Sequence, residues 1–293
     1  MKNLKLIIFI LLLAAAGCKT AVNITSFREN AEKAEAAGDY VVATEAWKYY
    51  FSQLPSDHVP EDTTYARAAY TAYRGGDAGQ ALEWFEKARE RGYDQPEMHL
   101  LLAEIYRTRN DVTSELAELE YYIENYEVKQ QEVYKRLFDI YYASDRQEDA
   151  MEVWSKIPDV DKGTEQYLER YFELNKKFEN EEKADSASLE LLSLNPEHVD
   201  ALEWQAQKNY EKGEARYNRE MKKYEARPTS GSYQTLLRQL KSATADLRKS
   251  LQYFEKLWEV NPESRSEYAV YMNNIHVRFN EKEKADYYRK FVN

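Results

Sequence analysis

The position of the one cysteine, Cys18, indicates covalent chemistry at the N-terminal end of the chain. It follows an apolar run, residues 6–16, and a single glycine, and Lys2 and Lys5 flank the start of that run. A short basic segment, a short apolar core and small residues before a break are typical of an export signal. The run is shorter than the roughly 18 apolar residues that a membrane-spanning helix needs. We therefore expect residues 1–17 to be a cleaved leader outside the fold.

Residues 15–18, Ala-Ala-Gly-Cys, resemble the lipobox of bacterial lipoproteins. In that family the signal peptide is cleaved before the cysteine, which then carries acyl chains. The resemblance implies a covalent lipid on Cys18, an acylated linker over residues 18–23 and no other cofactor. Two or more acyl chains hold a protein stably at a membrane surface. Lys19 stands where lipoproteins of the inner membrane often carry aspartate, which implies a periplasm-facing outer-membrane lipoprotein. The alternative is an ordinary secretory signal that leaves a free thiol.

Outside the leader, no spacing of reactive side chains predicts catalysis. The four histidines, His58, His99, His198 and His276, include no pair four residues apart, and no phosphate-binding, dinucleotide-binding or nucleophile-elbow motif occurs. With Cys18 acylated, the chain has no cysteine nucleophile and no cysteine metal ligand. We expect no catalytic residue, no metal site and no enzymatic activity.

The composition predicts that helices carry any binding site. The 293 residues include only 9 glycines and 7 prolines, while alanine, leucine, glutamate and lysine are abundant beside 25 tyrosines. This composition is typical of helical proteins. The formal net charge of −11 becomes −13 without the two leader lysines. Because contacts to phosphates need clustered Lys and Arg, we expect no nucleic-acid partner.

Small residues recur at intervals close to one or two units of 34 residues. They are Ala43, Ala81, Ala150, Ala184, Ser250 and Ala285. Four positions after several of them stands an aromatic residue, namely Trp47, Phe85, Trp154 and Phe254. Twelve positions after three of them stands a proline that would end a helix, namely Pro55, Pro196 and Pro262. Polar turns, such as Gly38-Asp39, Gly76-Asp77 and Asp145-Arg146, precede the small residues.

This pattern resembles the tetratricopeptide repeat, a helix–turn–helix of 34 residues. The small residue lets two helices approach closely, and the aromatic residue one turn later fills the gap beside it. The resemblance implies an all-α solenoid of about seven helix pairs, with five repeats over residues 24–197 and a capping pair over residues 263–293. The match is weaker at residues 96–127, where Glu115 occupies the small position. The alternative is a generic helical bundle.

Residues 198–262 do not divide into repeats of this length. Residues 199–226 contain no proline and one glycine, Gly213, and residues 227–232 form the clearest loop of the chain. A second helical stretch follows over residues 233–260. We expect one extended hairpin whose helices, at about 28 residues, reach about 42 Å.

This hairpin is basic in an acidic protein, because residues 211–250 contain ten basic and five acidic side chains. The basic hairpin residues of interest are Arg216, Arg219, Lys222, Lys223, Arg227, Arg238 and Lys241. One interpretation is a solvated helix tip. The other is a contact element for an acidic partner or an anionic headgroup surface.

In tetratricopeptide families, particular positions of each first helix line a concave groove. Carried over by the 34-residue spacing, the resemblance implies partner-binding residues in the second, third and fourth repeats. They are Tyr70, Tyr73, Arg74, Glu104, Arg107, Lys135, Asp139 and Tyr142. A surface that mixes aromatic and charged side chains suits an extended peptide or a helix.

The sequence therefore predicts a membrane-anchored scaffold or adaptor in the bacterial cell envelope, with an envelope protein or peptide as its partner. Roles in outer-membrane assembly, secretion or the control of cell-wall enzymes are all compatible with it, and the oligomeric state stays open. A glycan- or nutrient-binding lipoprotein on the same helices is the second interpretation, because 25 tyrosines and 5 tryptophans offer stacking surfaces. Exposed tryptophans would favour it.

Overall fold

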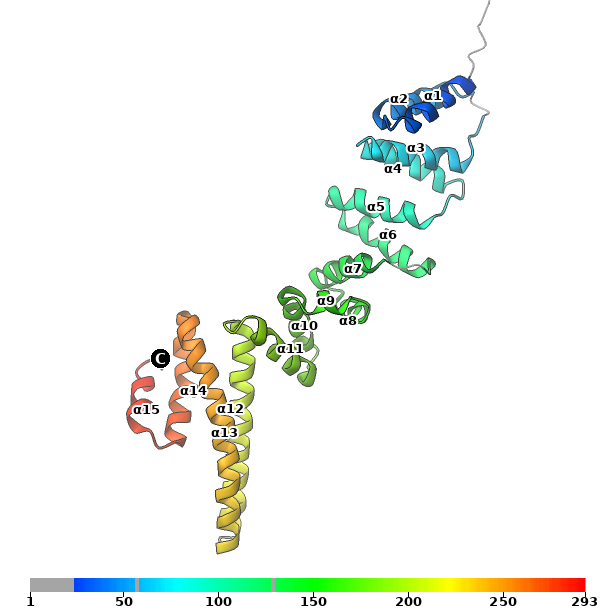
Figure 1. The fold of residues 1–293 in the computed structure, drawn as a ribbon. Helices are drawn as coiled ribbons and strands as arrows, with labels where there is room; N and C mark the ends of the chain where they lie inside the picture. The colour runs from blue at the N-terminus through cyan, green and yellow to red at the C-terminus, as the bar shows by residue number, and fades with distance from the viewer. Residues whose placement is uncertain (1–23, 56–57, 128–129, 293) are drawn as a thin grey trace, which may run out of the picture. The chain divides into compact units, whose positions relative to one another are not determined.

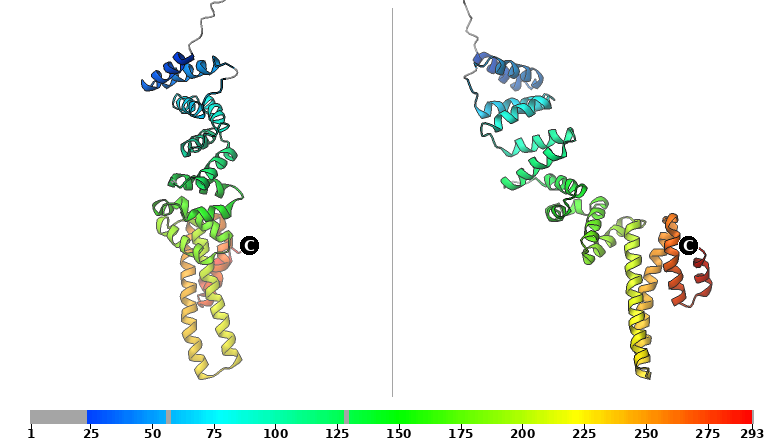
Figure 2. Two further views of the ribbon diagram at one scale, coloured as in Figure 1. Left: turned by 90° about the vertical axis from the view of Figure 1, so that its right-hand side faces the viewer. Right: turned by 180° about the vertical axis from the view of Figure 1, so that it is seen from behind.

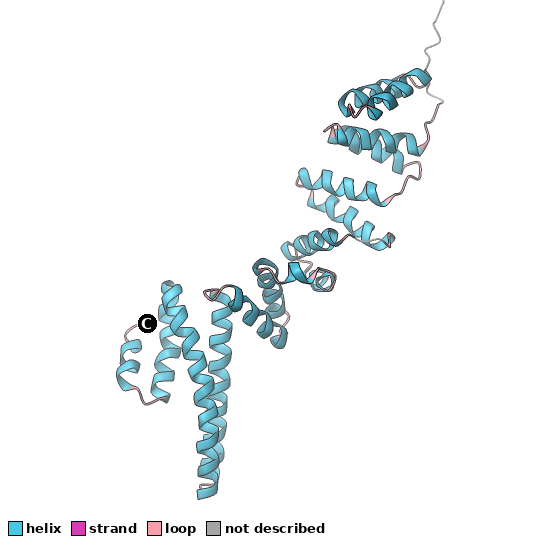
Figure 3. Cartoon of the chain, viewed as in Figure 1, coloured by secondary structure: helices cyan, strands magenta, loops and turns pink. Residues whose placement is uncertain are grey.

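The computed structural model describes residues 24–55, 58–127 and 130–292. Every regular element in these ranges is a helix, as Figure 3 shows by colour. The chain divides into two compact units, which we call unit 1, up to residue 129, and unit 2, from residue 130 on. The predicted leader and Cys18 lie outside the described residues, so cleavage and acylation stay predictions.

Unit 1 consists of three helix pairs, each joined by a short turn (Figure 1). The pairs are α1 (Ile24–Ala36) with α2 (Tyr40–Ser52), α3 (Asp62–Arg74) with α4 (Ala78–Arg89), and α5 (Pro96–Thr108) with α6 (Val112–Asn125). Helix α2 also packs on α3, and α4 on α5, so each pair covers part of the next. The first helices α1, α3 and α5 are the ones on which the repeat places its binding positions.

Unit 2 contains four more pairs, one of them much longer than the others. The pairs are α7 (Gln131–Ala143) with α8 (Gln147–Trp154), α10 (Glu165–Lys177) with α11 (Glu181–Leu194), α12 (Val199–Ala226) with α13 (Ser230–Val260), and α14 (Arg265–Arg278) with α15 (Lys282–Arg289). A short helix, α9 (Asp159–Lys162), precedes α10, and a 3-10 turn, Pro262–Ser264, follows α13. The predicted all-α fold of about seven helix pairs with one extended hairpin is confirmed.

The small positions of the repeat lie where paired helices meet. Ala43, Ala81, Ala150 and Ser250 are fully buried. Ser250 also donates from Oγ to the carbonyl of Ala206 at 2.7 Å, which satisfies its hydroxyl inside the hairpin. The repeat aromatics pack beside them, since Trp47, Phe85 and Phe254 have no exposed surface. In the third pair Glu115 takes the small position and is itself buried.

The turns between the paired helices of unit 1 share one backbone geometry. Gly38 and Gly76 adopt positive φ of 77° and 82°, where glycine meets no Cβ clash. The aspartates that follow, Asp39 and Asp77, cap the second helices by accepting from backbone N–H groups. In the third pair Asn110 takes the positive φ, and its neighbour is again an aspartate cap. The Gly-Asp signal in the sequence is therefore a helix start with a defined geometry.

Helices α12 and α13 form the extended hairpin and run side by side in both views of Figure 2. They approach closely at Gly213, where an added Cβ would lie 2.7 Å from Cγ of Leu247 and 3.2 Å from the carbonyl oxygen of Ala243. The turn at the end of the hairpin is closed by Thr229 and Ser232, which form a capping box at the start of α13. Among the described helices, none combines the length and apolarity needed to cross a bilayer.

Candidate functional site

In unit 1, the predicted partner-binding residues of α3 line two adjoining cavities. Tyr70 and Arg74 belong to both, and Tyr73 belongs to the second. The spacing of these residues places them on one side of α3. We call the surface formed by Tyr70, Tyr73, Arg74 and Glu104 the Tyr70 face.

The first cavity of the Tyr70 face has a volume of about 410 Å³. Its lining comes from α1, α2, α3 and the loop before α5, and consists of Glu35, Tyr40, Thr63, Ala66, Arg67, Tyr70, Thr71, Arg74 and Tyr93. The guanidinium of Arg74 lies over the ring of Tyr40, 5.5 Å from its centroid, and Nη1 donates to the Tyr40 hydroxyl at 3.4 Å. The pairing leaves the cation at the cavity wall with no carboxylate partner among the described residues.

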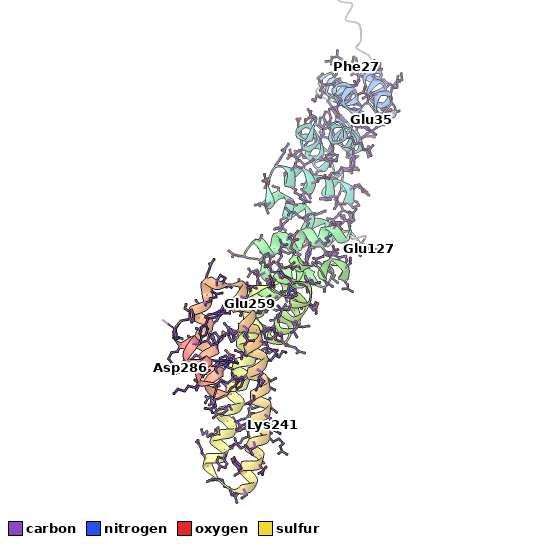
Figure 4. The ribbon with its side chains drawn as sticks, turned by 60° about the vertical axis from the view of Figure 1, so that its left-hand side comes forward. Phe27, Glu35, Glu127, Lys241, Glu259 and Asp286 are labelled. Atoms are coloured by element: carbon purple, nitrogen blue, oxygen red, sulfur yellow. The ribbon has the colours of Figure 1, made fainter. Side chains whose placement is uncertain are left out.

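Glu35, labelled in Figure 4, holds the three helices around this cavity together. Its carboxylate accepts from Nε1 of Trp47 and from Oγ1 of Thr71, both at 2.6 Å. Arg67 also pairs with it at 2.7 Å. These bonds join α1, α2 and α3, so the cavity wall is preorganised. The repeat spacing did not predict Glu35, because its role depends on contacts between successive pairs.

The second cavity, of about 330 Å³, is lined mainly by apolar surface from α3 and α5, at Tyr70, Tyr73, Arg74, Glu97, Leu100 and Leu101. Burial and a hydrogen bond to Glu104 raise the pKa of Tyr73 to about 12. Burial, and then a hydrogen bond to Tyr93, raise the pKa of Tyr70 well above its ordinary value. The structure thus brings Tyr73 and Glu104 together, as neighbouring first helices require.

Arg107 is exposed on α5, one turn beyond Glu104. No ion pair among the described residues involves it, and it lines neither cavity of the Tyr70 face. It is a free cation next to that face rather than part of its wall.

The predicted partner-binding residues of unit 2 already have partners within the unit. Lys135 pairs with Asp161 at 2.9 Å, and Asp139 pairs with Arg170 of α10. Tyr142 donates to Glu173, also on α10. Burial and this bond raise the pKa of Tyr142 to about 12. These side chains connect α7 to the helices that follow it.

A polar cluster that the sequence did not reveal surrounds His99 in unit 1. The ring is buried, with Nδ1 2.6 Å from Oε2 of Glu118 and Nε2 2.8 Å from Oδ1 of Asp94. Tyr121 and Tyr126 donate to the same Asp94 carboxylate, and Arg89 pairs with Glu118 at 2.6 Å. Neither ring nitrogen is free to act as a base, because a carboxylate occupies each.

The carboxylates of this cluster are held in their charged form. Hydrogen bonds, the one from Tyr126 foremost, lower the pKa of Asp94 to about 2. Burial acts to raise the pKa of Glu118, but hydrogen bonds from His99 and Arg89 outweigh it and lower the pKa. The cluster borders a cavity of about 400 Å³ between α4, α5 and α6. Among the described residues, no group of three or more His, Cys, Asp or Glu is arranged to hold a metal ion.

The basic hairpin residues fall into two sets. Three of them pair with acids of the hairpin: Arg216 with Asp246 at 3.4 Å, and Arg219 and Lys223 with Glu220 at 3.0 and 2.9 Å. The other four are exposed and have no ion pair among the described residues: Lys222, Arg227, Arg238 and Lys241.

None of the five tryptophans is exposed. Trp47 and Trp84 are buried, and Trp154, Trp204 and Trp258 are half-buried. Trp154 stacks on Tyr171 at 4.3 Å with nearly parallel rings. The tryptophan surface that would support glycan binding is therefore largely used in packing.

No family model matches the chain, and no curated protein matches it. The arrangement is similar to solved tetratricopeptide structures. One, from Parabacteroides merdae, is 16% identical, with 92% of this chain and 93% of that chain covered and a TM-score of 0.40. The C-terminal part of a repeat protein from Cytophaga hutchinsonii is 14% identical, with 91% and 93% covered and a TM-score of 0.41. A repeat protein from Bacteroides fragilis is 15% identical, with 87% and 98% covered and a TM-score of 0.34. The helix pairs themselves, with their buried small residues and capped turns, establish a tetratricopeptide-type α-helical repeat fold.

Proposed function

We propose that the chain is a protein-interaction scaffold that holds an extended segment of a partner on the Tyr70 face of unit 1. Rigid first helices present side chains in register, which suits recognition of a peptide or a protein helix. Binding needs no reacting group, and we propose no catalysis.

One observation carries this proposal: two cavities lie next to each other and share Tyr70 and Arg74. The second cavity is mainly apolar and suits an aliphatic or aromatic side chain. Arg74 stands at the boundary of the two and has no carboxylate partner within the part of the chain that the structure describes. A partner segment with an apolar residue beside an acidic one would match this order of surfaces.

The anchor and the location extend the proposal to the cell. We propose that Cys18 carries the lipid and that the protein faces the periplasm from the outer membrane. Confinement to a membrane surface raises the effective concentration of envelope partners without any new contact. Outer-membrane assembly, secretion and control of cell-wall enzymes are the processes in which such a scaffold would act.

The Tyr70 face is tested by photo-crosslinking in cells. A photoreactive residue replaces Arg107, beside the face, and a control chain carries it in place of Arg289 on α15. We expect a defined envelope-protein adduct from the first chain and none from the second. Adding Tyr73→Ala and Arg74→Ala to the first chain should reduce the adduct about 30-fold, because two central contacts are lost. The matched addition, Tyr287→Ala, should leave it unchanged. An adduct that survives Tyr73→Ala and Arg74→Ala contradicts the site.

The anchor is tested separately by incorporation of a labelled fatty acid. The wild-type chain should take up the label and fractionate with the outer membrane, and Cys18→Ala should lose both properties. Label uptake by Cys18→Ala, or fractionation with soluble periplasmic protein by the wild type, contradicts the lipoprotein proposal. Neither result bears on the Tyr70 face.

A further inference from the structure

The end of the extended hairpin stands clear of the other helices of unit 2. The contacts that α14 makes toward the tip are those of Arg278 with Glu214 and Tyr217 on α12, and of Phe279 with Arg248 on α13. Beyond them the two helices pack only on each other, as the lower end of the hairpin in Figure 1 shows. We call residues 218–247 the hairpin arm. Helix α12 extends about ten residues beyond its contacts with α14, a length of about 15 Å.

The hairpin arm carries a net positive charge, because its six basic side chains exceed its three acidic ones, Glu220, Glu225 and Asp246. Nearer its base, Lys212 and Arg216 face Asp246. Farther out, Glu220 is covered by Arg219 and Lys223, and hydrogen bonds from these two side chains, that of Lys223 first, lower its pKa. Four cations of the arm form no ion pair with any residue that the structure describes, namely Lys222, Arg227, Arg238 and Lys241. All four are exposed along the hairpin arm, in a protein whose formal net charge is −11.

Exposed apolar side chains lie among these cations. Tyr233 and Leu237 are 45% and 40% exposed, and together with Lys241 they follow each other at four-residue spacing on one face of α13. Tyr233 packs on the half-buried Tyr224 of α12, with 5.8 Å between the ring centroids. Figure 4 labels Lys241 on the distal part of the hairpin.

We propose that the hairpin arm docks on an anionic lipid surface, with its cations at the headgroups and Tyr233 and Leu237 at the boundary with the acyl chains. Long basic side chains around a tyrosine and a leucine match that boundary, where charge and apolar surface are needed within a few ångströms. An acidic protein surface would pair with the cations but would leave the apolar pair, Tyr233 and Leu237, without a partner. The apolar pair on the same face favours a membrane, and this site is separate from the Tyr70 face.

Hydrogen bonds in the turn and close helix packing at the base hold the side chains of the hairpin arm in position. Thr229 and Ser232 exchange side-chain and backbone hydrogen bonds across the turn, at 2.8 to 3.1 Å. The close approach at Gly213 fixes the two helices together at the base of the arm. The docking side chains therefore stand on an ordered end rather than on a loose loop.

The test is flotation of the chain from Lys19 to Asn293 with lipid vesicles, since this chain holds every described residue but lacks the leader and Cys18. Vesicles of phosphatidylcholine mixed with phosphatidylglycerol are compared with vesicles of phosphatidylcholine alone. We expect binding to the anionic vesicles only, weakened by added salt. Reversing four cations (Lys222→Glu, Arg227→Glu, Arg238→Glu and Lys241→Glu) should weaken partitioning about 100-fold.

A matched control reverses four exposed lysines elsewhere and changes the net charge equally. It carries Lys33→Glu, Lys183→Glu, Lys282→Glu and Lys290→Glu. We expect its partitioning to stay within about threefold of the unmodified chain, since long-range charge is screened by salt. Equal losses in the two variants overturn the proposal, because net charge rather than the arm would then control binding.

A second pair of measurements separates a lipid surface from an acidic protein. Tyr233→Ser with Leu237→Ser keeps all cations and should reduce vesicle partitioning about tenfold. Polyglutamate serves as the acidic polypeptide probe. If the chain binds polyglutamate through the four cations but does not float with anionic vesicles, the proposal is wrong and the arm binds acidic protein. Circular dichroism of each variant verifies the helices.

Discussion

The predicted binding positions of α3 in unit 1 and of α7 in unit 2 descend from the same repeat pattern but differ in what they contact. On α3, Arg74 lies over Tyr40, pairs with no carboxylate of residues 24–55, 58–127 or 130–292, and lines two cavities. The binding positions of α7 are not available to a partner, because Arg170 of α10 lies over Tyr142 and also pairs with Asp139. A repeat position is therefore available for binding only where the next helix does not supply its counter-charge.

This difference separates two uses of the same side-chain types. In unit 2, charges on the first helices join successive helices. In unit 1, Glu35 and the buried cluster around His99 join successive helices from other positions, which leaves the Tyr70 face open. The predictions below test this separation.

The largest expected effect is on the buried cluster of unit 1. Glu118→Gln removes the charge that faces His99 and Arg89, and should lower the free energy of unfolding of unit 1 by about 2 to 3 kcal/mol. Hydrogen exchange of α4 to α6, followed by mass spectrometry, measures it. Glu104→Gln is the matched control on the exposed face and should change stability by less than about 0.5 kcal/mol. Equal effects of the two changes would remove the distinction between the cluster and the face.

The next effect is on partner affinity once an adduct from the Tyr70 face has been identified. Arg74→Ala should weaken binding of that partner about tenfold, which corresponds to about 1.4 kcal/mol. Arg170→Ala should change it by less than about twofold, since Arg170 is already paired inside unit 2. Titration calorimetry with the identified partner segment measures both. A greater loss from Arg170→Ala would reverse the comparison.

The free energies of unfolding should show the opposite order, with Arg170→Ala more destabilising than Arg74→Ala. Arg170→Ala breaks the pair with Asp139 and the contact with Tyr142, and should lower the unfolding free energy of unit 2 by about 1 kcal/mol. Arg74→Ala should cost less than about 0.5 kcal/mol in unit 1. Urea unfolding followed by circular dichroism gives both values. If Arg74→Ala is the more destabilising change, the Tyr70 face is a packing surface.

The smallest effect concerns acid. The pKa of Asp94 is about 2 in the folded chain and is ordinarily 3.8, so the unfolded chain binds the proton more readily. Its stabilising contribution is complete above pH 4 and is lost as the pH falls toward 2. The loss of unfolding free energy between pH 4 and pH 2 should therefore be smaller for Asp94→Asn than for the unmodified chain. Thermal unfolding at both pH values measures it, and an unchanged difference between them would show that Asp94 contributes nothing in this range.

The helix pairs could be predicted from the sequence because the responsible signals are local. Ala81 and Phe85 lie within one helix, and the turn at Gly76-Asp77 immediately precedes it. The extended hairpin was also predictable, because nothing between residues 199 and 226 breaks a helix. Boundaries inside unit 2 were harder, since α9 lies in a stretch where the repeat pattern gives no signal.

The open and closed binding positions could not be predicted in the same way. Whether Arg74 or Asp139 is free depends on side chains about 30 residues away, which the spacing of one repeat does not specify. The His99 cluster joins residues from a loop and three helices, and its one local sign is Asp94 five residues before the histidine. Charge compensation between successive pairs is thus the information that a repeat pattern lacks.

The missing side chain at Gly213 has a mechanical consequence. Two helices in close contact resist bending as one beam, whereas two separated helices would flex independently. A load applied at the tip of the hairpin would then pass along both helices to its base near α14, because the close contact between Gly213 and Leu247 ties the two helices together.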